Sequence, residues 1–401
     1  MKVLFVVANH PPEALGGTEQ VVVALTRELT ALGVSCAVVS GSDVPHAGVD
    51  ALEEGHAGVP VVRVPRRPDE RDQHGFVRPR LLALLQAQIA HHRPDVVHVH
   101  SFAHFGTGIA ALCRAAGAPM VVTCHDLWVT CARYFRLPAP GLTCPRGSER
   151  GPCVPCVQTV LPADAATIAA ALAERDRLLR AEFAAAAAVT TPSATAAAFV
   201  RECLPFPGPI DVIPHGLLHA VPPAHRAPAP APGERLRVGT FGGLVRSKGL
   251  VELLDAVAGL PCELHLTGRL HEPDLQALVD ERQRRGLPVV WRGTWGPADR
   301  HPARDLHLAV FPSKCQETYG LVVDEALAHG VPTVVSDAGA LAERAATPGV
   351  VVTPLSALAP TLRELVGSPS RLAALRAAIP ATLPTIALSA QRHLALYRRL
   401  R

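Results

Sequence analysis

One strand–loop–helix–strand unit constrains the fold more than any other stretch of the chain. The apolar run Leu308–Phe311 is typical of a buried strand, and residues 320–328 predict a short helix. Gly330 and Pro332 end that helix, and residues 333–336 restore the strand. The N-terminus of such a helix presents backbone N–H groups and a partial positive charge, so we expect an anion to bind there.

Two glutamates extend this expectation along the helix. Glu317 lies in the loop before the helix and Glu325 lies inside it, roughly 7–8 Å beyond Gly320 at the helical rise. This spacing suits a hydroxylated group at Glu317, phosphates at Tyr319, Gly320 and Leu321, and a second hydroxylated ring at Glu325. A nucleotide-diphosphate sugar has this order of parts. The alternative is a solvated surface, which is usual for glutamate.

The segment E-T-Y-G-L-V-V-D-E, residues 317–325, closely resembles the E-x7-E signature of family 4 retaining glycosyltransferases. The resemblance implies an α/β chain with the GT-B fold, two doubly wound Rossmann-like domains that face a central cleft. It implies that Glu317 orients the donor sugar, as one of the catalytic residues, and that Glu325 holds the ribose. It also implies that the departing diphosphate is stabilised without a catalytic metal.

The implied reaction moves a sugar from a nucleotide-diphosphate-sugar donor, for which a UDP-sugar is the expected choice. The implied acceptor bears a hydroxyl or an amine, as a glycan, a lipid-linked molecule or a small natural product does. Two alternatives of the same fold stay open: a nucleotide-sugar epimerase or isomerase, and an inactive nucleotide-sugar-binding partner.

The first half of the chain alternates apolar runs with helical segments, which is typical of a doubly wound α/β domain. Gly16 and Gly17 follow the first strand, where glycine lets the backbone approach a ligand, although the dinucleotide fingerprint G-x-G-x-x-G is absent. His125 and Asp126 follow the predicted strand Met120–Thr123, at the edge where open α/β sheets bind ligands. Paired glycines can also serve turn geometry alone, and a lone histidine is more often structural.

The same resemblance assigns roles to these residues. A G-G-x-E loop faces the donor phosphates and the acceptor in that family, and residues 16–19 match it. Gly16 and Gly17 are therefore expected on the donor side, while Thr18, Glu19 and Asp126 are expected on the acceptor side. An H-D pair belongs to the active site of the family, so His125 is a candidate catalytic residue.

The sequence has only three lysines: Lys2, Lys248 and Lys314. Lys248 lies in a phosphate-binding type of turn, and lysine supplies a compact charge that arginine does not copy. The turn resembles the family motif G-R-L-x-x-x-K-G, which makes Lys248 a candidate catalytic and donor-binding residue. Gly243 stands where that family has arginine, so Arg246 is the candidate for the second cation at the diphosphate. The alternative is a surface lysine.

Four cysteines form the pattern C-x12-C-x8-C-x2-C in a predicted insertion, 127–160, that is rich in Gly, Pro and Arg: Cys131, Cys144, Cys153 and Cys156. Four thiolates can hold a structural zinc ion or an iron–sulfur cluster, which would stabilise a segment with little core. Four reduced thiols, or an adventitious disulfide, are the alternatives. A metal-sensing or redox protein centred on these cysteines is a third alternative function.

The amino-acid composition narrows the classes of protein to which the chain can belong. The chain is 48% hydrophobic and 18% charged, with a net charge of +4 and no basic block, so we expect no nucleic-acid partner. Neither a secretory signal nor a membrane span is predicted. We therefore expect a cytoplasmic protein with reduced cysteines, for which peripheral membrane contact stays open.

The predicted domain order follows from the strand pattern and one proline-rich stretch. It comprises an acceptor-side domain at 1–216, a linker at 217–235, a donor-binding domain at 236–384 and a terminal helix at 385–401 that packs back on the first domain.

Overall fold

The computed structural model describes residues 1–44, 51–66, 75–145, 147, 149–204, 206–296 and 299–401. The chain forms two compact units. The first comprises Met1–Leu218 with Thr385–Arg401, and the second comprises His219–Pro384. Residues 146 and 148 of the predicted insertion lie outside the described residues.

The first unit is built on one sheet whose strands pair in parallel, apart from one hairpin at its edge. Strands of this kind are buried on both faces, which explains why they appear in the sequence as continuous apolar runs. The spatial order is β3 (Leu52–His56), β4 (Val59–Pro65), β2 (Ser35–Ser42), β1 (Lys2–Val7), β5 (Val96–Val99), β6 (Met120–Thr123), β7 (Ala188–Thr191) and β8 (Ile210–Val212).

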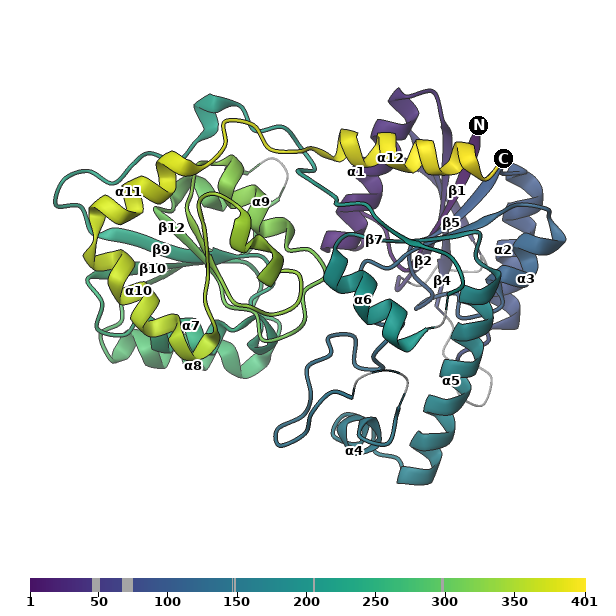
Figure 1. Ribbon diagram of the computed structural model, residues 1–401, viewed down its shortest axis with the longest axis horizontal. Coiled ribbons are helices and arrows are strands. Elements are labelled where there is room, and N and C mark those ends of the chain that lie inside the picture. The colour runs from purple at the N-terminus through teal and green to yellow at the C-terminus, as the bar shows by residue number, and fades with distance from the viewer. Residues whose placement is uncertain (45–50, 67–74, 146, 148, 205, 297–298) are drawn as a thin grey trace. The chain divides into compact units, whose positions relative to one another are not determined.

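Helices cover both faces of this sheet, as Figure 1 shows. Two of them begin at side-chain caps: Asp164 accepts a hydrogen bond from the backbone N–H of Thr167, and Ser193 accepts one from Ala196. The helices are α1 (Gly17–Ala31), α2 (Pro79–His92), α3 (Ile109–Ala115), α4 (Cys153–Gln158), α5 (Ala165–Ala185), α6 (Ala194–Cys203) and α12 (Ile386–Arg399).

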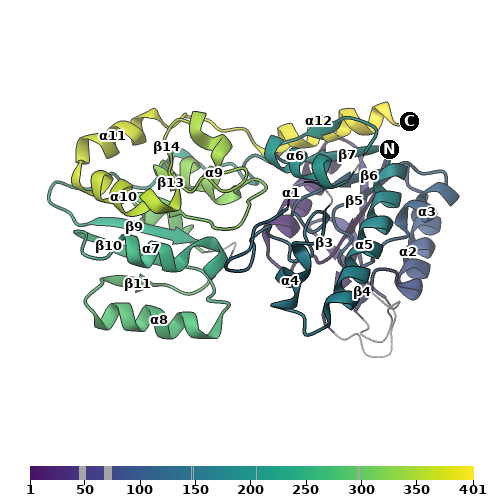
Figure 2. The same cartoon turned by 60° about the horizontal axis from the view of Figure 1, so that its bottom comes forward.

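The second unit has a parallel sheet of its own. Its strand order is β11 (Val289–Trp291), β10 (Cys262–Thr267), β9 (Leu236–Phe241), β12 (Leu308–Phe311), β13 (Thr333–Val335) and β14 (Val350–Val352). Figure 2 shows β9, β10 and β11 side by side, with α8 beyond β11. The helices are α7 (Leu250–Ala256), α8 (Pro273–Arg284), α9 (Leu321–Ala328), α10 (Leu358–Gly367) and α11 (Pro369–Ala378).

Three elements are not apparent from apolar runs in the sequence. The strand β3 is antiparallel to β4, and its residues are mostly polar and exposed. The helices α10 and α11 are separate, since Pro369 cannot continue α10 and instead opens α11. The insertion contains the short helix α4.

The proline-rich stretch expected as a linker, 217–235, packs on the units. Leu217 and Leu218 are buried in the first unit. In the second unit, the imidazole of His329 lies 2.8 Å from the carbonyl oxygen of His225, and the backbone N–H of Ala227 donates to the carbonyl of His329. These contacts hold residues 225–227 against the end of α9.

The terminal helix α12 lies beside α1 in the first unit, and the two are drawn in yellow and purple in Figure 1. Arg399 pairs with Asp211 at 3.4 Å and Arg401 with Asp95 at 3.2 Å, near the end of the helix. Surface pairs of this kind contribute little to stability. The buried Tyr397 anchors the helix more firmly, since it is fully inaccessible to solvent.

Tyr397 joins α12 to the strands through a buried polar contact. Its hydroxyl lies 2.6 Å from Nδ1 of His98, whose Nε2 lies 2.7 Å from the hydroxyl of Thr123. The hydroxyls of Thr123 and Thr190 are 2.5 Å apart. A continuous set of hydrogen bonds therefore runs from α12 across β5, β6 and β7.

None of the helices in the described part of the chain is both long and apolar enough to cross a membrane.

The substitution Tyr397→Phe should lower the free energy of unfolding by about 1–2 kcal/mol, because it leaves Nδ1 of His98 buried without its hydroxyl partner. Urea unfolding followed by circular dichroism measures the loss as a lower midpoint. Arg392→Gln, an exposed change in the same helix, is the control and should leave the midpoint unchanged. Equal midpoints for wild type and Tyr397→Phe would contradict the anchoring role of this contact.

Candidate active site

The predicted anion site lies where the chain passes from β12 to α9. Gly320 precedes Leu321, the first residue of α9, and has a φ of 87°, a backbone conformation that residues with a Cβ rarely adopt. A Cβ at Gly320 would also lie 2.8 Å from the side chain of Leu341. The turn therefore depends on glycine, and it leaves the N-terminus of the eight-residue helix α9 at the carboxyl edge of the sheet.

A buried ion pair holds this turn. Tyr319 donates its hydroxyl hydrogen to Asp324 at 2.7 Å, and Arg344 donates to the other oxygen of Asp324 at 2.9 Å. The guanidinium of Arg344 also lies over the ring of Tyr319, 4.7 Å from its centroid. Burial disfavours the charge on Arg344, but Asp324 more than offsets this and raises the pKa of Arg344. Tyr319 is thus held from two sides.

Asp324 and Arg344 are functional candidates that sequence reasoning missed. An acidic residue inside an apolar helix, with an arginine 20 residues later, is a signal only once the fold brings the two together. Tyr319 was predicted for the donor site, and the pair explains how its position is fixed.

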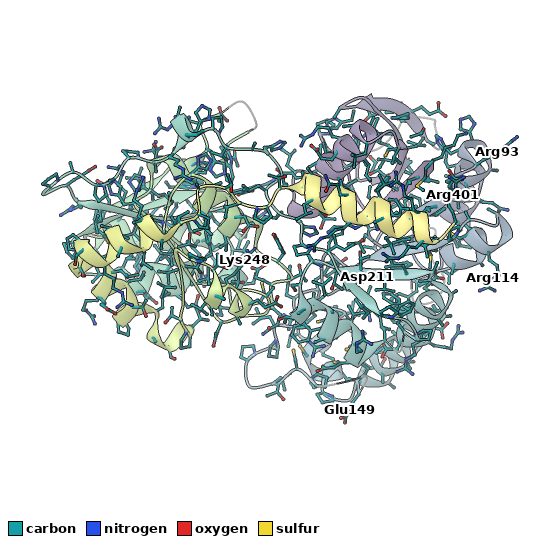
Figure 3. The ribbon with its side chains drawn as sticks, turned by 45° about the horizontal axis from the view of Figure 1, so that its top comes forward. Arg93, Arg114, Glu149, Asp211, Lys248 and Arg401 are labelled. Carbon is teal, nitrogen blue, oxygen red and sulfur yellow. The ribbon has the colours of Figure 1, made fainter. Side chains whose placement is uncertain are left out.

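Lys248 and Glu317, predicted from separate motifs, lie in direct contact. Lys248 Nζ is 2.5 Å from Glu317 Oε1, and Figure 3 labels the lysine within the second unit. Burial lowers the pKa of Lys248, and the charges of Glu317 and Cys315 offset it, so that the pKa rises overall. Lys248 is therefore held as a cation at neutral pH.

A second glycine makes this contact geometrically feasible. Gly249 has a φ of 79°, and a Cβ there would lie 1.9 Å from the carbonyl oxygen of Pro312. The Lys248 turn consequently packs directly on the end of β12, which carries the loop of Glu317.

Arg246 lies in a different environment from the one expected of a diphosphate ligand. Its backbone N–H donates to Glu272 at 2.8 Å, and its guanidinium pairs with both Glu272 and Asp274 at the start of α8. Two carboxylates already compensate its charge. Its predicted role as the substitute for the missing arginine stays a prediction.

Glu325 lies on α9 beside a group of aromatic side chains. Its Oε2 is 3.6 Å from Nε2 of His301, and that imidazole stacks on His329 at 4.5 Å between centroids. Phe241 and Trp295 lie 5.1 and 6.2 Å from the ring of His301. The carboxylate therefore stands next to flat surfaces that sequence reasoning did not identify, because they come from three separate loops and strands.

In the first unit, the glycine loop opens directly into α1. Gly17 is the first residue of the helix, and a Cβ on Gly16 would lie 2.4 Å from the carboxylate of Glu19. Thr18 and Glu19 therefore form the first turn of α1. Burial raises the pKa of Glu19, and the charge of Asp126 raises it further. The structure thus brings Glu19 and Asp126 within electrostatic range of each other, and their acceptor-side role stays a prediction.

The H-D pair follows β6 and is deeply placed. Asp126 accepts a hydrogen bond from the backbone N–H of Trp128 at 2.8 Å, and burial raises the pKa of its carboxyl. His125 lies between two other imidazoles, with Nε2 2.5 Å from Nδ1 of His100 and Nδ1 3.4 Å from Nε2 of His215. Burial holds the pKa of His125 well below its usual range, so the ring is neutral.

The four cysteines of the insertion are free thiols in the structure. Cys156 Sγ accepts hydrogen bonds from Arg133 at 3.1 Å and from the backbone N–H of Ala139 at 3.4 Å. Among the residues that the structure describes, no three His, Cys, Asp or Glu side chains are placed to hold a metal ion. Burial raises the pKa of Cys144, and the thiols of Cys131, Cys156 and Cys153 raise it further, so the four cysteines lie near one another. A structural zinc or iron–sulfur cluster stays a prediction.

Arg344→Met should lower the free energy of unfolding of the second unit by about 3 kcal/mol, because the Asp324 carboxylate would stay buried without its cation. Thermal unfolding of wild type and variant measures the difference. Arg371→Met is the matched control: it breaks an exposed pair with Glu364 in the same unit and should cost less than about 1 kcal/mol. Equal losses in the two variants would show that the Asp324 pair does not hold the turn.

Two family models match the chain, one within each unit. The model of glycosyltransferase family 4 matches residues 15–218, slightly more than half of the chain, and that of glycosyl transferases group 1 matches residues 235–368. No curated protein sequence matches the chain.

Solved structures match over whole chains at low sequence identity. A sucrose-phosphate synthase from Thermosynechococcus elongatus aligns with a TM-score of 0.68 at 19% identity, covering 100% of this chain and 99% of that one. HepE from Anabaena, solved with UDP, aligns with a TM-score of 0.63 at 17% identity, covering 100% of both chains. A trehalose 6-phosphate synthase from Burkholderia multivorans aligns with a TM-score of 0.63 at 16% identity, covering 100% of this chain and 99% of that one.

These matches confirm the GT-B fold expected from the sequence. The two family models together follow the succession of the two units. The chain therefore belongs to glycosyltransferase family 4.

Proposed function

We propose that the chain is a retaining, metal-independent glycosyltransferase that uses a UDP-sugar and a hydroxyl- or amine-bearing acceptor. The observation that carries the proposal is the Lys248–Glu317 pair beside the N-terminus of α9, with Glu325 on the same helix. These groups supply a cation, helix N–H groups and two carboxylates in the order that a nucleotide-diphosphate sugar needs.

The ion pair suggests how the donor is received. A diphosphate competes with Glu317 for Lys248, and it adds the N–H groups at Gly320 and Leu321 as further ligands. Glu317, released from the lysine, becomes an acceptor for hydroxyls of the donor sugar. The exchange of one anion for another keeps the positive charge of Lys248 compensated throughout.

The same groups account for the reaction step. Negative charge grows on the diphosphate as the glycosidic bond breaks, and Lys248 with the α9 N-terminus stabilises that charge. In the retaining reaction that we propose, the acceptor enters on the face that the diphosphate leaves, and no carboxylate serves as a covalent nucleophile. Glu19 and Asp126 are the proposed acceptor-side groups, with His125 beside them.

The nucleoside end of the donor is assigned to Glu325 and its aromatic neighbours. Glu325 accepts hydrogen bonds from the ribose hydroxyls, and Trp295 with His301 offers flat surfaces for the base. The choice of a UDP-sugar is supported by the Anabaena protein HepE, which was solved with UDP and with UDP-glucose.

Glu325→Ala should weaken UDP binding about 5- to 150-fold, the range expected when charged hydrogen bonds worth about 1–3 kcal/mol are lost. Isothermal titration of wild type and variant with UDP measures this. Glu343→Ala, which removes a carboxylate elsewhere in the same unit, is the comparison and should bind UDP as the wild type does. Unchanged affinity in Glu325→Ala would place Glu325 on a solvated surface.

Lys248→Ala should lower kcat about 100-fold while changing KM less, because the leaving-group charge develops mainly in the transition state. A thermal-shift screen of nucleotide sugars first selects the donor, and release of its nucleotide is then followed with time. Lys314→Ala is the matched control, since Lys314 is a partly exposed lysine of the same unit that pairs with Glu252 instead.

Equal kcat in wild type and Lys248→Ala would defeat the proposed mechanism. A wild-type protein that binds nucleotide sugars but releases no nucleotide with any acceptor would support the inactive binding partner.

A further inference from the structure

Three aromatic side chains lie in a row beside Asp126, and the proposed reaction makes no use of them. The ring centroid of Tyr134 lies 6.5 Å from that of Trp128 and 6.2 Å from that of Phe135. Tyr134 is 38% exposed and Phe135 is 46% exposed, whereas Trp128 is half-buried. The sequence has only three tryptophans and three tyrosines, and one of each lies here, so the row gathers a scarce kind of side chain.

The backbone that carries the two outer rings is strained. Tyr134 has a φ of 69° and Arg136 has a φ of 44°, both in the left-handed region that residues with bulky side chains rarely adopt. Arg136 is buried and fixes the bend: its Nη2 donates to the carbonyl of Pro145 at 2.9 Å, and its guanidinium lies 4.6 Å from the ring centroid of Phe199.

This bend holds an apolar ring in water. Backbone strain persists only where surrounding contacts impose it, and it concentrates at sites that bind ligands. Phe135, between the two strained residues, is the most exposed ring of the row and gains little burial from the bend. A surface that receives a ligand accounts for both the strain and the exposure.

The inner end of the row is fixed to Asp126. The backbone N–H of Trp128 donates to the Asp126 carboxylate at 2.8 Å, and the guanidinium of the buried Arg175 lies 4.7 Å from the centroid of the Trp128 ring. Burial raises the pKa of Tyr134, and the charge of Asp126 raises it further, so the second ring also lies near this carboxylate. The rings and the carboxylate therefore belong to one part of the first unit.

A sugar ring matches this combination of groups. A carboxylate accepts hydrogen bonds from hydroxyls, and the negative face of an aromatic ring attracts the C–H groups on the apolar face of a sugar. A hydrocarbon chain would cover the rings but would leave the neighbouring carboxylate without a partner.

A cationic ligand is less well suited than a neutral one. Arg175 of the protein itself already provides the cation–π contact of Trp128. The charges of Arg66 and Arg78 also act on the Tyr134 hydroxyl. These guanidinium groups would repel an ammonium group placed on the rings.

We propose that Trp128, Tyr134 and Phe135 form a stacking surface for a sugar ring of the acceptor, so that the acceptor is a neutral carbohydrate. The inference rests on the proposed function in taking this part of the first unit as the acceptor side. A hydroxyl of the acceptor sugar donates to Asp126 while the C–H face of the same ring lies on the aromatic row.

Binding is measured by saturation-transfer NMR on the full-length protein in the presence of UDP, with methyl glycosides of neutral mono- and disaccharides as probes. We expect at least one glycoside to bind, with the strongest saturation at the C–H protons of one ring face. Hexanol, which offers a hydrocarbon chain and one hydroxyl, and methyl glucosaminide, which offers an ammonium group, are the comparison probes and should bind less tightly.

Two variants remove one ring each. Tyr134→Gly should fold, because glycine adopts the left-handed φ without strain, and Phe135→Ala changes an exposed side chain. Each should weaken binding of the best glycoside about 3- to 10-fold, the loss expected for one stacking contact. Tyr134→Phe keeps the ring and should bind as the wild type does.

Val160→Ala is the matched control, since it removes an exposed apolar side chain of the same insertion and should leave glycoside binding unchanged. Titration with UDP should give the wild-type affinity in all four variants, because the proposed donor groups lie in the second unit.

Glycoside binding that is unchanged in both ring variants would overturn the inference, as would tighter binding of hexanol or methyl glucosaminide than of every neutral glycoside. A wild type that binds UDP but none of the glycosides would overturn it as well. A wild type that binds glycosides through these rings but neither binds nor cleaves a nucleotide sugar would support the stacking surface and count against the proposed function.

Discussion

The contact between Lys248 and Glu317 is the interaction on which the second unit's site depends. It joins two βα turns that are far apart in sequence, and it exists because Gly249 allows one turn to pack on the strand that carries the other. A lysine with a raised pKa beside a carboxylate keeps its charge but has that charge compensated. The protein thus carries a cation at the helix N-terminus without leaving it unpaired in a partly buried place, which would be costly.

Local patterns in the sequence predict much of this unit. The glycine before α9, the glycine after Lys248 and the apolar runs of β9, β10 and β12 each impose their structure through backbone conformation or burial. Resemblance to a family then connects the two turns. What local patterns do not contain is pairing between distant polar residues: Asp324 with Arg344, Arg246 with Glu272, and the aromatic surfaces beside Glu325. Those partners become neighbours only when the sheet order is known.

The first unit shows the same division between local and distant information. The strands and the placement of His125 at a strand end follow from the sequence, but its imidazole neighbours His100 and His215 do not, because they follow other strands, 25 and 90 residues away. The four cysteines of the insertion are a third case. Their spacing suggests an ion, and the fold brings the four thiols near one another. The N–H donors at Cys156 fit a thiolate with or without an ion.

The terminal helix α12 has a consequence for how the protein is made. It belongs to the first unit, although the chain reaches it only after completing the second. During synthesis, residues 1–218 therefore leave the ribosome without the helix that covers α1 and supplies Tyr397 to His98. All residues of the second unit are synthesised before α12. The first unit begins the chain but completes its core last, whereas N-terminal domains usually fold first. Emergence of α12 is thus the event that allows the first unit to finish folding.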